Sequence, residues 1–472
     1  MEQSSTSRRQ FLGGSAHMLG ALAAGQLLLR DAEGAAPARR QKPHFAGKVK
    51  RIIFLFQAGG PSQIDLLDHK PMLREWHTKE LPKSVMRDTK FTGMVNGQSR
   101  FPVVASPWEF AQHGQSGAWV SELFPHFSNV VDDVCIIRSM TTPQVDHDAA
   151  ITWLQTGHQI AGRPTAGAWI TYGLGSECND LPAYVALRST NGQSFLIDRH
   201  WGSGFLPSRY QGIRVGGADG EPEKYLNNPA GMNQSLRNRT IADIAALNRA
   251  HHQRVGDPEI ETRIAQYELA ARMQMSVPEL TDLSDETQAT FDLYGEDAKE
   301  PGTYAWNALM ARRLAERGVR FTQLFQGGWD NHSNLPKKIV EYAVYTDRAN
   351  AALVTDLKQR GLLEDTLVIW GGEFGRTVFC QGKLTQDNFG REHHGLCFTM
   401  WLAGAGVKPG MVYGATDDWS FRATENPVSV HDFYATILHL LGFDHERLTH
   451  RFSGRDFRLT DLFGKVVKEI LT

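Results

Sequence analysis

The stretch RIIFLFQAGGPSQIDLLDHK, residues 51–70, begins with an unbroken apolar run and continues into a loop rich in glycine and aspartate. The run at Arg51–Gln57 shows no polar alternation, which is typical of a strand buried on both faces of a sheet. The loop after it carries Asp65 and Asp68. A buried strand followed by such a loop indicates a parallel α/β sheet.

Similar runs recur along the chain, with helical patterns between them. The stretch Asp347–Asp365 has apolar residues at helical spacing and leads directly into one of these runs. This alternation predicts an α/β protein with a mainly parallel sheet and helices on both faces. Further strands are expected at Asp133–Ser139, Ala183–Arg188, Arg320–Gln326, Thr366–Trp370 and Cys397–Ala403.

One region interrupts this alternation. Residues 202–238 are rich in Gly, Pro, Asn and Arg without periodicity, which indicates a long surface excursion. Asp257 and Pro258 then form an N-cap and first-turn pair for a helix over Glu259–Met275. Its apolar residues Ile264, Tyr267 and Ala271 are expected to pack against the sheet. We therefore expect one domain over residues 48–472, with a loop and helical insertion at about 202–318.

The first 38 residues have the order of an export signal. SRRQFLGG, residues 7–14, precedes a charge-free apolar run over Gly13–Leu29, and small residues suggest cleavage near Ala38. This predicts recognition by the twin-arginine export machinery and a periplasmic or extracellular protein. A frayed basic terminus before an ordinary helix, or an uncleaved anchor, is the alternative. The run is short for a membrane span, for which about 20 apolar residues are needed, so the mature chain is expected to have none.

The charge balance excludes some partners. The formal net charge is −2, and no basic stripe suited to nucleic acid is present.

Acidic and imidazole side chains gather in the segments that follow the predicted strands and in the one that precedes the last strand. Ligands of open α/β sheets bind beyond the carboxyl ends of the strands, so these side chains are expected to converge. Carboxylates combined with imidazoles suit zinc, manganese or iron, and with fewer imidazoles calcium or magnesium. The converging set is Asp65, Asp68, Asp146, His147, Asp148, Asp330, His332, Glu373, His393 and His394.

The segment GGWDNHSN, residues 327–334, contains the pair that best fits a metal site. Asp330 and His332 are two positions apart, so in an extended segment both side chains leave on the same side. An Asp that caps a turn beside a His that bonds a carbonyl is the structural alternative. Because the pair follows a strand and other candidate ligands occupy equivalent places, we favour a divalent metal site.

The neighbouring residues leave alternatives open. His393 and His394 are adjacent and should point to opposite sides of an extended chain, so one of them is expected to bind the ion. We favour His394, beside Gly395. His393 could orient a carboxylate, meet the substrate or lie at the surface. Arg376 could pair with Glu373 or hold an anionic substrate group.

These residues carry a family resemblance. From about Lys50 to Thr472 the chain resembles the sulfatase-like branch of the alkaline phosphatase superfamily, and specifically the bacterial family called domain of unknown function 1501, through segments such as FQAGGPSQIDLLDHKP, GGWDNH, GGEFGRT and HHGLCFTMWLAGAGVKPG. The resemblance implies a three-layer α/β/α sandwich that uses one or two metals to hydrolyse sulfate or phosphate esters. It also implies metal ligands at Asp330, His332 and His394, with Glu373 at a second acidic position and Asp65 the nearest acid after the first strand.

Two departures from the superfamily pattern affect the chemistry. Phe374 stands where a second metal ligand would follow the acid. Counting back from Gly157 puts His147 at the position of the sulfatase nucleophile, and Ile151 replaces the following Arg. The formylglycine mechanism is therefore excluded. His147 could act as a nucleophile, a metal ligand or a general base, or His147, Asp146 and Asp148 could be purely structural.

We therefore expect an exported, metal-dependent hydrolase of sulfate, phosphate or related esters, with a small molecule or glycan ester as substrate. The expected chemistry uses metal-bound water rather than a side-chain nucleophile. The alternative is a non-catalytic extracytoplasmic binding or scaffold protein that retains the fold. Expected catalytic residues are His147, Asp146, Arg376 and His393, and expected ligands of a zinc, calcium, magnesium or manganese ion are Asp65, Asp330, His332, Glu373 and His394.

Overall fold

The computed structural model describes residues 42–472 except 88, 90, 193–196, 216–230, 232, 257 and 386. The predicted export signal therefore lies outside the described residues. None of the helices in the described part of the chain has an apolar stretch sufficient to cross a bilayer.

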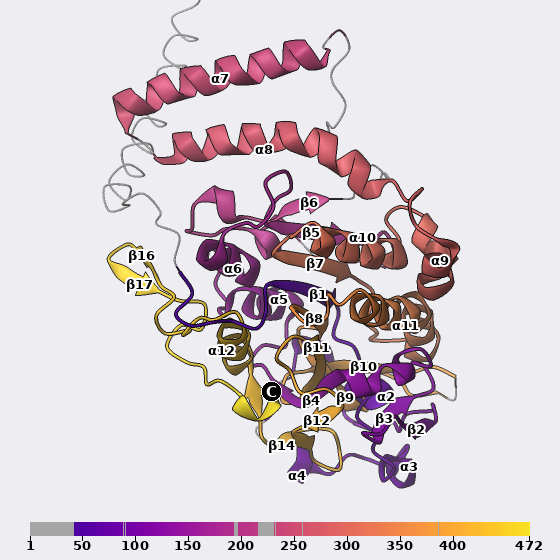
Figure 1. Cartoon of the computed structure of the whole chain (residues 1–472). Helices are drawn as coiled ribbons and strands as arrows, with labels where there is room; N and C mark the ends of the chain where they lie inside the picture. Colours follow the sequence, from indigo (N-terminus) through magenta and orange to yellow (C-terminus); the bar gives the residue numbers. More distant parts are fainter. Residues whose placement is uncertain are drawn as a thin grey trace, which may run out of the picture.

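A nine-stranded sheet runs through the centre of the described structure (Figure 1). β1 lies between β7 and β8 and is parallel to both, and β5 and β6 continue the parallel order beyond β7. β11 is antiparallel to its neighbours β4 and β8. The sheet is therefore mainly parallel, as predicted. Its order is β12 (Met411–Tyr413), β4 (Val134–Thr141), β11 (Phe398–Gly404), β8 (Thr366–Gly371), β1 (Arg51–Gln57), β7 (Phe321–Gln326), β5 (Tyr184–Arg188) and β6 (Ile213–Val215), with β15 (Val428–Ser429) beside β4.

The side chains of β1 alternate between two cores, one on each face of the sheet. Ile53 and Leu55 pack with α10 and α11, whereas Phe54 and Phe56 pack with α5, α6 and α12. A strand buried on both sides explains the unbroken apolar run. The fold is thus the expected three-layer α/β/α sandwich, with α5 (His147–Thr156), α6 (Ala166–Leu174) and α12 (Val430–Leu440) on one face and α10 (Tyr304–Glu316) and α11 (Leu335–Gln359) on the other.

The predicted strands are all present, with ends that differ by no more than two residues. The helix predicted from Asp347 begins earlier, at Leu335. Asn334, in the left-handed region at φ 56°, precedes it, and Pro336 lies in its first turn. Proline at the start of a helix is favourable because its missing N–H is not needed there.

The insertion contains a pair of long helices, α7 (Gln234–Val255) and α8 (Pro258–Thr281), which lie beyond β6 (Figure 1). Buried Ile264 of α8 packs with Ala245 of α7, and Tyr267 is 48% exposed. Ile264 therefore packs against α7 and not against the sheet, and Tyr267 is largely exposed, which corrects the expectation for these two residues; the side chain of Ala271 lies outside the described residues. Further along α8, Met273, Val277 and Leu280 join the core of the sandwich. The expected N-cap, Asp257, lies outside the described residues. β6 and α10 also fall within the range assigned to the insertion, but they belong to the sandwich.

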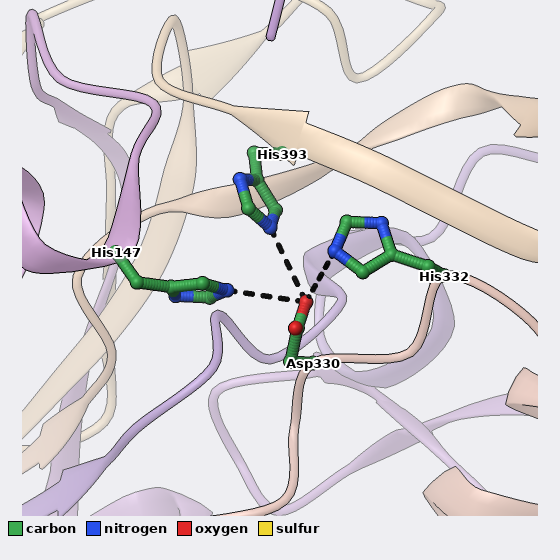
Figure 2. Close-up of side chains that lie close together, drawn as sticks. All are labelled: His147, Asp330, His332 and His393. Carbon is green, nitrogen blue, oxygen red and sulfur yellow. Dashed lines mark hydrogen bonds and ion pairs between the residues drawn. The ribbon is translucent and has the colours of Figure 1, made fainter. Parts of the chain in front are cut away.

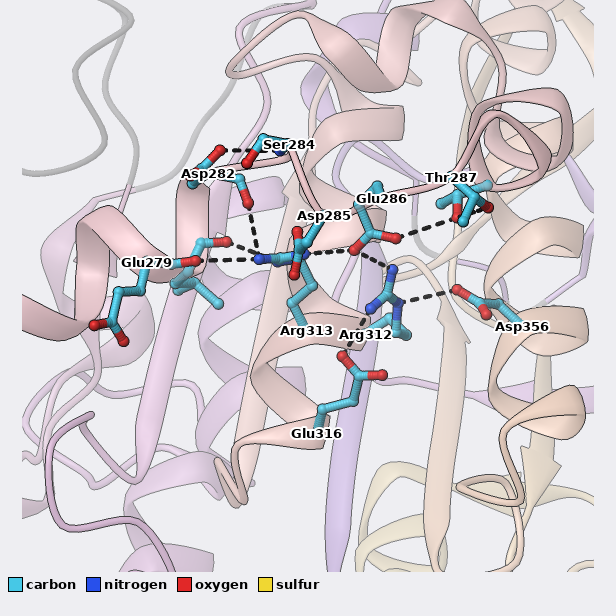
Figure 3. Close-up of polar contacts among 12 residues, drawn as sticks. Glu279, Asp282, Ser284, Asp285, Glu286, Thr287, Arg312, Arg313, Glu316 and Asp356 are labelled. Atoms are coloured by element: carbon cyan, nitrogen blue, oxygen red, sulfur yellow. Dashed lines mark hydrogen bonds and ion pairs between the residues drawn. The ribbon is translucent and has the colours of Figure 1, made fainter.

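Two buried arginines of α10 anchor the chain that follows α8 (Figure 3). The guanidinium of Arg312 contacts Glu286 at 2.6 Å, Glu316 at 2.7 Å and Asp356 of α11 at 3.0 Å. Arg313 contacts Glu286 at 2.5 Å and donates to the carbonyl of Asp282 at 2.8 Å. This network fixes the connection between α8 and α9 (Gln288–Tyr294) against the sandwich.

A β-ribbon of β9 (Gly375–Gln381) and β10 (Gly390–His394) follows β8 and leads back into β11. Because β8 ends at the carboxyl edge and β11 returns from it, the ribbon lies at that edge of the sheet. The remaining short elements are α2 (Gln63–Leu66), α3 (Leu73–Trp76), α4 (Lys83–Met86), β2 (Phe110–His113), β3 (Ala118–Ser121), β13 (Ala415–Thr416), β14 (Ala423–Glu425), β16 (His450–Phe452) and β17 (Arg455–Phe457).

Candidate metal centre

Four side chains converge at the carboxyl edge of the sheet (Figure 2). Asp330 and His332 follow β7, His147 is the first residue of α5 after β4, and His393 lies in β10. We call these four residues the His3Asp cluster. Segments far apart in the sequence meet there because parallel strands end at the same edge.

The cluster is compact. The Nε2 atoms of His332, His147 and His393 lie 2.7, 3.2 and 3.2 Å from Asp330 Oδ1, and all four potential ligand atoms lie within 4.8 Å of one another. Two ligands about 2.0–2.1 Å from a tetrahedral zinc ion are about 3.3 Å apart. The three distances to Asp330 are close to this value, and the cluster could hold a metal ion.

The other ring nitrogen of each histidine faces an oxygen atom. Nδ1 of His393 lies 2.6 Å from the carbonyl of Val145, and Nδ1 of His147 lies 2.7 Å from Glu373 Oε1. Nδ1 of His332 contacts the side-chain oxygen of Gln381. A carbonyl and a carboxylate only accept hydrogen bonds, so Nδ1 of His147 and of His393 carries the proton. In the neutral rings Nε2 then presents a lone pair to the cluster.

This arrangement requires positive charge at the centre. Lone pairs that face the Asp330 carboxylate repel it unless a cation lies among them or the imidazoles are protonated. Burial lowers the pKa of His147, but hydrogen bonds to Asp330 and Glu373 outweigh it and raise the pKa to about 9. Burial and the charge of Arg376 leave the pKa of His393 below its usual value. Without a cation, His147 therefore holds a proton, whereas His393 loses its proton more readily than an ordinary histidine.

The carboxylate of Asp330 stays ionised. Burial acts to raise its pKa, but bonds from His147, His332 and His393 outweigh this effect, and the pKa lies well below its usual range. Metal ligands must be deprotonated carboxylates and neutral imidazoles, so Asp330 already has the required form, and a cation that binds here would displace the proton held by His147.

Glu373 lies behind His147. Its Oε1 accepts the Nδ1–H of His147 and the backbone N–H of Gly59 at 2.9 Å, while Oε2 is buried without a hydrogen-bond partner among the described residues. Gly59 has φ 114°, and a Cβ atom there would lie 2.5 Å from the backbone nitrogen of Asp330. Only glycine permits this approach. The structure thus places Glu373 as the carboxylate that orients a cluster histidine, a frequent partner of metal-bound imidazoles.

Arg376 is 1% exposed and fully engaged by the protein. It donates to Asp330 Oδ1 at 2.7 Å and to the carbonyls of Gly60 and Arg391, both at 3.0 Å. It does not pair with Glu373 and has no exposed group for a substrate anion. Its role is to hold Asp330 in place.

Three of the five expected ligands are not in the cluster: Glu373 contacts His147 from behind, and Asp65 and His394 lie away from it. Asp65 forms a two-point ion pair with buried Arg391, at 2.8 and 3.0 Å. His394 is buried on the other side of β10, where Nε2 donates to the carbonyl of Phe421 at 2.6 Å. Burial lowers its pKa to about 4, so it stays neutral. Adjacent strand residues point to opposite sides, as expected, but His393 and not His394 faces Asp330.

The residues flanking His147 have distinct contacts. Asp146 is the N-cap of α5, and its side chain accepts the backbone N–H of Asp148 at 3.1 Å. Asp148 is exposed and pairs with Arg199. Asp146 therefore fixes the start of the helix that presents His147.

Sequence analysis missed three partners of the site residues, namely Arg199, Gln381 and the Val145 carbonyl, because only tertiary packing brings them to the site.

Comparison with solved structures finds distant similarities. A Mg-bound variant of the alkaline phosphatase from the Antarctic bacterium TAB5 is 10% identical over 76% of this chain and 92% of that chain, with a TM-score of 0.32. A Vibrio parahaemolyticus protein of the alkaline phosphatase superfamily is 12% identical, covering 85% and 68%, with a TM-score of 0.34. The PsFucS1 sulfatase from Pseudoalteromonas sp. is 13% identical, covering 85% and 69%, also with a TM-score of 0.34. These values are too low to support a statement about activity.

Among curated proteins no match is found. The family comparison is decisive, because one family pattern matches residues 49–471, almost the whole described chain. This confirms the family predicted from sequence: the chain belongs to the family described as "Protein of unknown function (DUF1501)".

Proposed function

We propose that this protein is an exported, metal-dependent hydrolase of sulfate, phosphate or related esters. The observation that supports the proposal is the set of three imidazole Nε2 atoms around one carboxylate oxygen, with two Nδ1 protons fixed by the Val145 carbonyl and by Glu373. Fixed tautomers are the arrangement that a metal ion requires of histidine ligands. His147, Asp330, His332 and His393 would hold the ion.

A divalent cation in such a site would lower the pKa of a water molecule and offset charge that develops on the ester oxygens. The chain supplies the remaining parts. Glu373 accepts the Nδ1–H of His147 and so keeps Nε2 of that ring directed at the cluster. Arg376 keeps Asp330 ionised and oriented. His147 serves as a ligand, because both ring nitrogens are engaged by Glu373 and the cluster.

Metal analysis and hydrolysis assays on the same preparations test this proposal. We expect the protein purified without added ions to contain a stoichiometric divalent metal and to hydrolyse 4-nitrophenyl sulfate or 4-nitrophenyl phosphate. Asp330→Ala should lose both the metal and the turnover. Asp456→Ala, which removes an exposed carboxylate on β17, is the matched control and should keep both.

The outcomes separate the hydrolase from its alternatives. A metal-free wild-type protein that also fails to take up zinc, manganese or magnesium would overturn the metal centre. Stoichiometric metal without turnover on either ester would favour the non-catalytic binding protein that retains the fold. In that case Asp330→Ala should lower thermal stability, because metal binding to the folded state stabilises it.

A further inference from the structure

A half-open cavity lies beside the loop that follows β9. Its volume is about 460 Å³, and its lining includes His77, Thr78, Arg100, Gly382, Lys383 and Thr385. We call it the Arg100 cavity. It contains none of the residues of the His3Asp cluster, so it is a separate site.

The charge of the Arg100 cavity is positive. Arg100 and Lys383 line it, and no acidic side chain is among its described lining residues. Among the described residues Arg100 forms one ion pair, with Glu80 at 3.6 Å, and the side chain of Arg100 is 73% exposed. Lys383 is exposed and makes no ion pair within the described part of the chain. Two cations line the cavity, and the single carboxylate paired with one of them does not line it, so the net charge of the lining is positive and attracts anions.

Neutral hydrogen-bonding groups complete the lining. Nδ1 of His77 accepts the backbone N–H of Ala105 at 3.4 Å, so the ring proton lies on Nε2 and is available as a donor. Thr78 has φ 69°, a conformation that a β-branched residue rarely adopts. Backbone strain of this kind persists where the surrounding structure enforces it, often at binding sites.

The Arg100 cavity and the His3Asp cluster share one loop. Gln381, which ends β9 and contacts His332, immediately precedes the lining residues Gly382 and Lys383. Further along the same loop, Asn388 Oδ1 accepts the backbone N–H of Asn334 at 2.6 Å. The loop is thus bonded to the segment that carries Asp330 and His332. A ligand in the cavity would lie against the far side of the loop that supports a cluster histidine.

We propose that the Arg100 cavity binds a sulfate or phosphate group carried by a sugar, as a recognition site for a part of the substrate away from the bond that is hydrolysed. A cavity of about 460 Å³ has room for a sugar ring that bears such a group. Arginine matches the oxygens of either anion through its planar fork, and lysine adds a point charge. The role as a substrate subsite rests on the proposed hydrolase function, whereas the binding itself does not.

Calorimetric titration tests the proposal, with glucose 6-sulfate and glucose 6-phosphate as probes and glucose as the neutral comparison. We expect the wild type to bind the two anionic sugars and not glucose. Affinity should fall between about 50 and 300 mM salt, because exposed charges are screened. The double variant Arg100→Ala/Lys383→Ala should bind at least about tenfold more weakly, since it removes both charged contacts to the anion. Both residues are exposed, so the variant should fold.

A matched control removes two exposed cations elsewhere. Lys358→Ala/Arg451→Ala also removes two positive charges, so it changes the net charge by the same amount. The two side chains are 59% and 67% exposed and pair with Asp133 and Asp456. It should bind the sugars like the wild type. Equal weakening in both double variants would show a general charge effect and overturn the site.

The variant Asp330→Ala separates this proposal from the hydrolase proposal. An anionic sugar could also bind at the metal centre, but that binding is absent once the cluster is lost. If the Arg100 cavity is a site, Asp330→Ala still binds glucose 6-sulfate or glucose 6-phosphate, and adding Arg100→Ala/Lys383→Ala abolishes this binding. If Asp330→Ala does not bind either sugar, the cavity proposal is wrong, even where metal and turnover are found in the wild type. A preference between the two sugars identifies the anion.

Discussion

His393 and His394 are neighbours on β10, yet their imidazoles serve opposite sides of the strand. Nε2 of His393 lies 3.2 Å from Asp330 Oδ1, whereas Nε2 of His394 donates to the carbonyl of Phe421 at 2.6 Å. One ring faces the cluster and the other is fully enclosed by protein. Substituting His393 should therefore affect metal binding, whereas substituting His394 should affect stability.

We expect His393→Ala to weaken metal binding by more than about 100-fold, because it removes one of four ligands and even indirect partners of such ligands account for about 10–100-fold. His394→Ala should keep its metal. It should lower the free energy of unfolding by roughly 2–4 kcal/mol, because it leaves a cavity and an unpaired carbonyl. Metal content and urea unfolding of both variants check this. Equal metal loss in the two variants would contradict the assigned orientation.

Glu373→Gln tests the carboxylate behind His147. The amide can still accept from Gly59, but it cannot offer a charged acceptor to Nδ1 of His147. We expect metal affinity to fall by about 10–100-fold without a loss of fold. Competition with a chelator of known affinity measures this. An unchanged affinity would mean that the contact between Glu373 and His147 does not orient the ligand.

The sheet could be predicted because its strands are buried on both faces and so read as continuous apolar runs. The same pattern placed Asp330 and His332 at the carboxyl edge, where the structure has them. The choice between His393 and His394 could not be made, because strand alternation shows that they point apart but not which one faces the edge. The irregular pairing of β10 with β9 between Arg391 and His393 also shifts the register locally.

The partners of the acidic residues were equally hidden from sequence. An Asp after the first strand can bind a metal ion or pair with a buried arginine. Asp65 pairs with Arg391, which is 326 positions away in the sequence, so the sequence alone does not show which partner it has. The same holds for Glu373, since its distance in sequence from His147 gives no sign of their contact. Long-range packing determines whether a carboxylate binds an ion or supports a ligand.

Arg312→Met should strongly destabilise the sandwich. The change leaves Glu286 and Asp356 with buried carboxylates that have lost a cationic partner. Glu286 keeps Arg313 and Asp356 keeps Arg360 as a partner, so we expect a cost of roughly 2–3 kcal/mol, below the cost of about 3–5 kcal/mol for a buried charge left without any partner. Urea unfolding of the purified variant measures this cost. Arg451→Met, which breaks an exposed pair, should change stability by no more than about 1 kcal/mol. Similar small effects for both would show that the α10 network is not stabilising.

Asp347 on α11 should make stability depend on pH. Its oxygens accept the backbone N–H groups of His126 at 2.7 Å and Phe127 at 2.8 Å. Burial raises the pKa of Asp347 to about 6, even though these hydrogen bonds act to lower it. The folded state therefore binds a proton more tightly than the unfolded state. Its stabilising contribution is fully present below about pH 4 and is lost as the pH rises through about 6.

Asp347→Asn removes the ionisation and leaves the size of the side chain unchanged. A shift of about two units corresponds to roughly 3 kcal/mol, so the wild type should lose up to that amount relative to the variant between about pH 4 and pH 7. Urea unfolding at a series of pH values gives the difference directly. The amide of the variant faces two N–H donors and so lowers stability, but by the same amount at every pH. The comparison therefore uses the change with pH and not the absolute stability. Parallel pH profiles for the two proteins over this range would show that folding does not raise the pKa of Asp347.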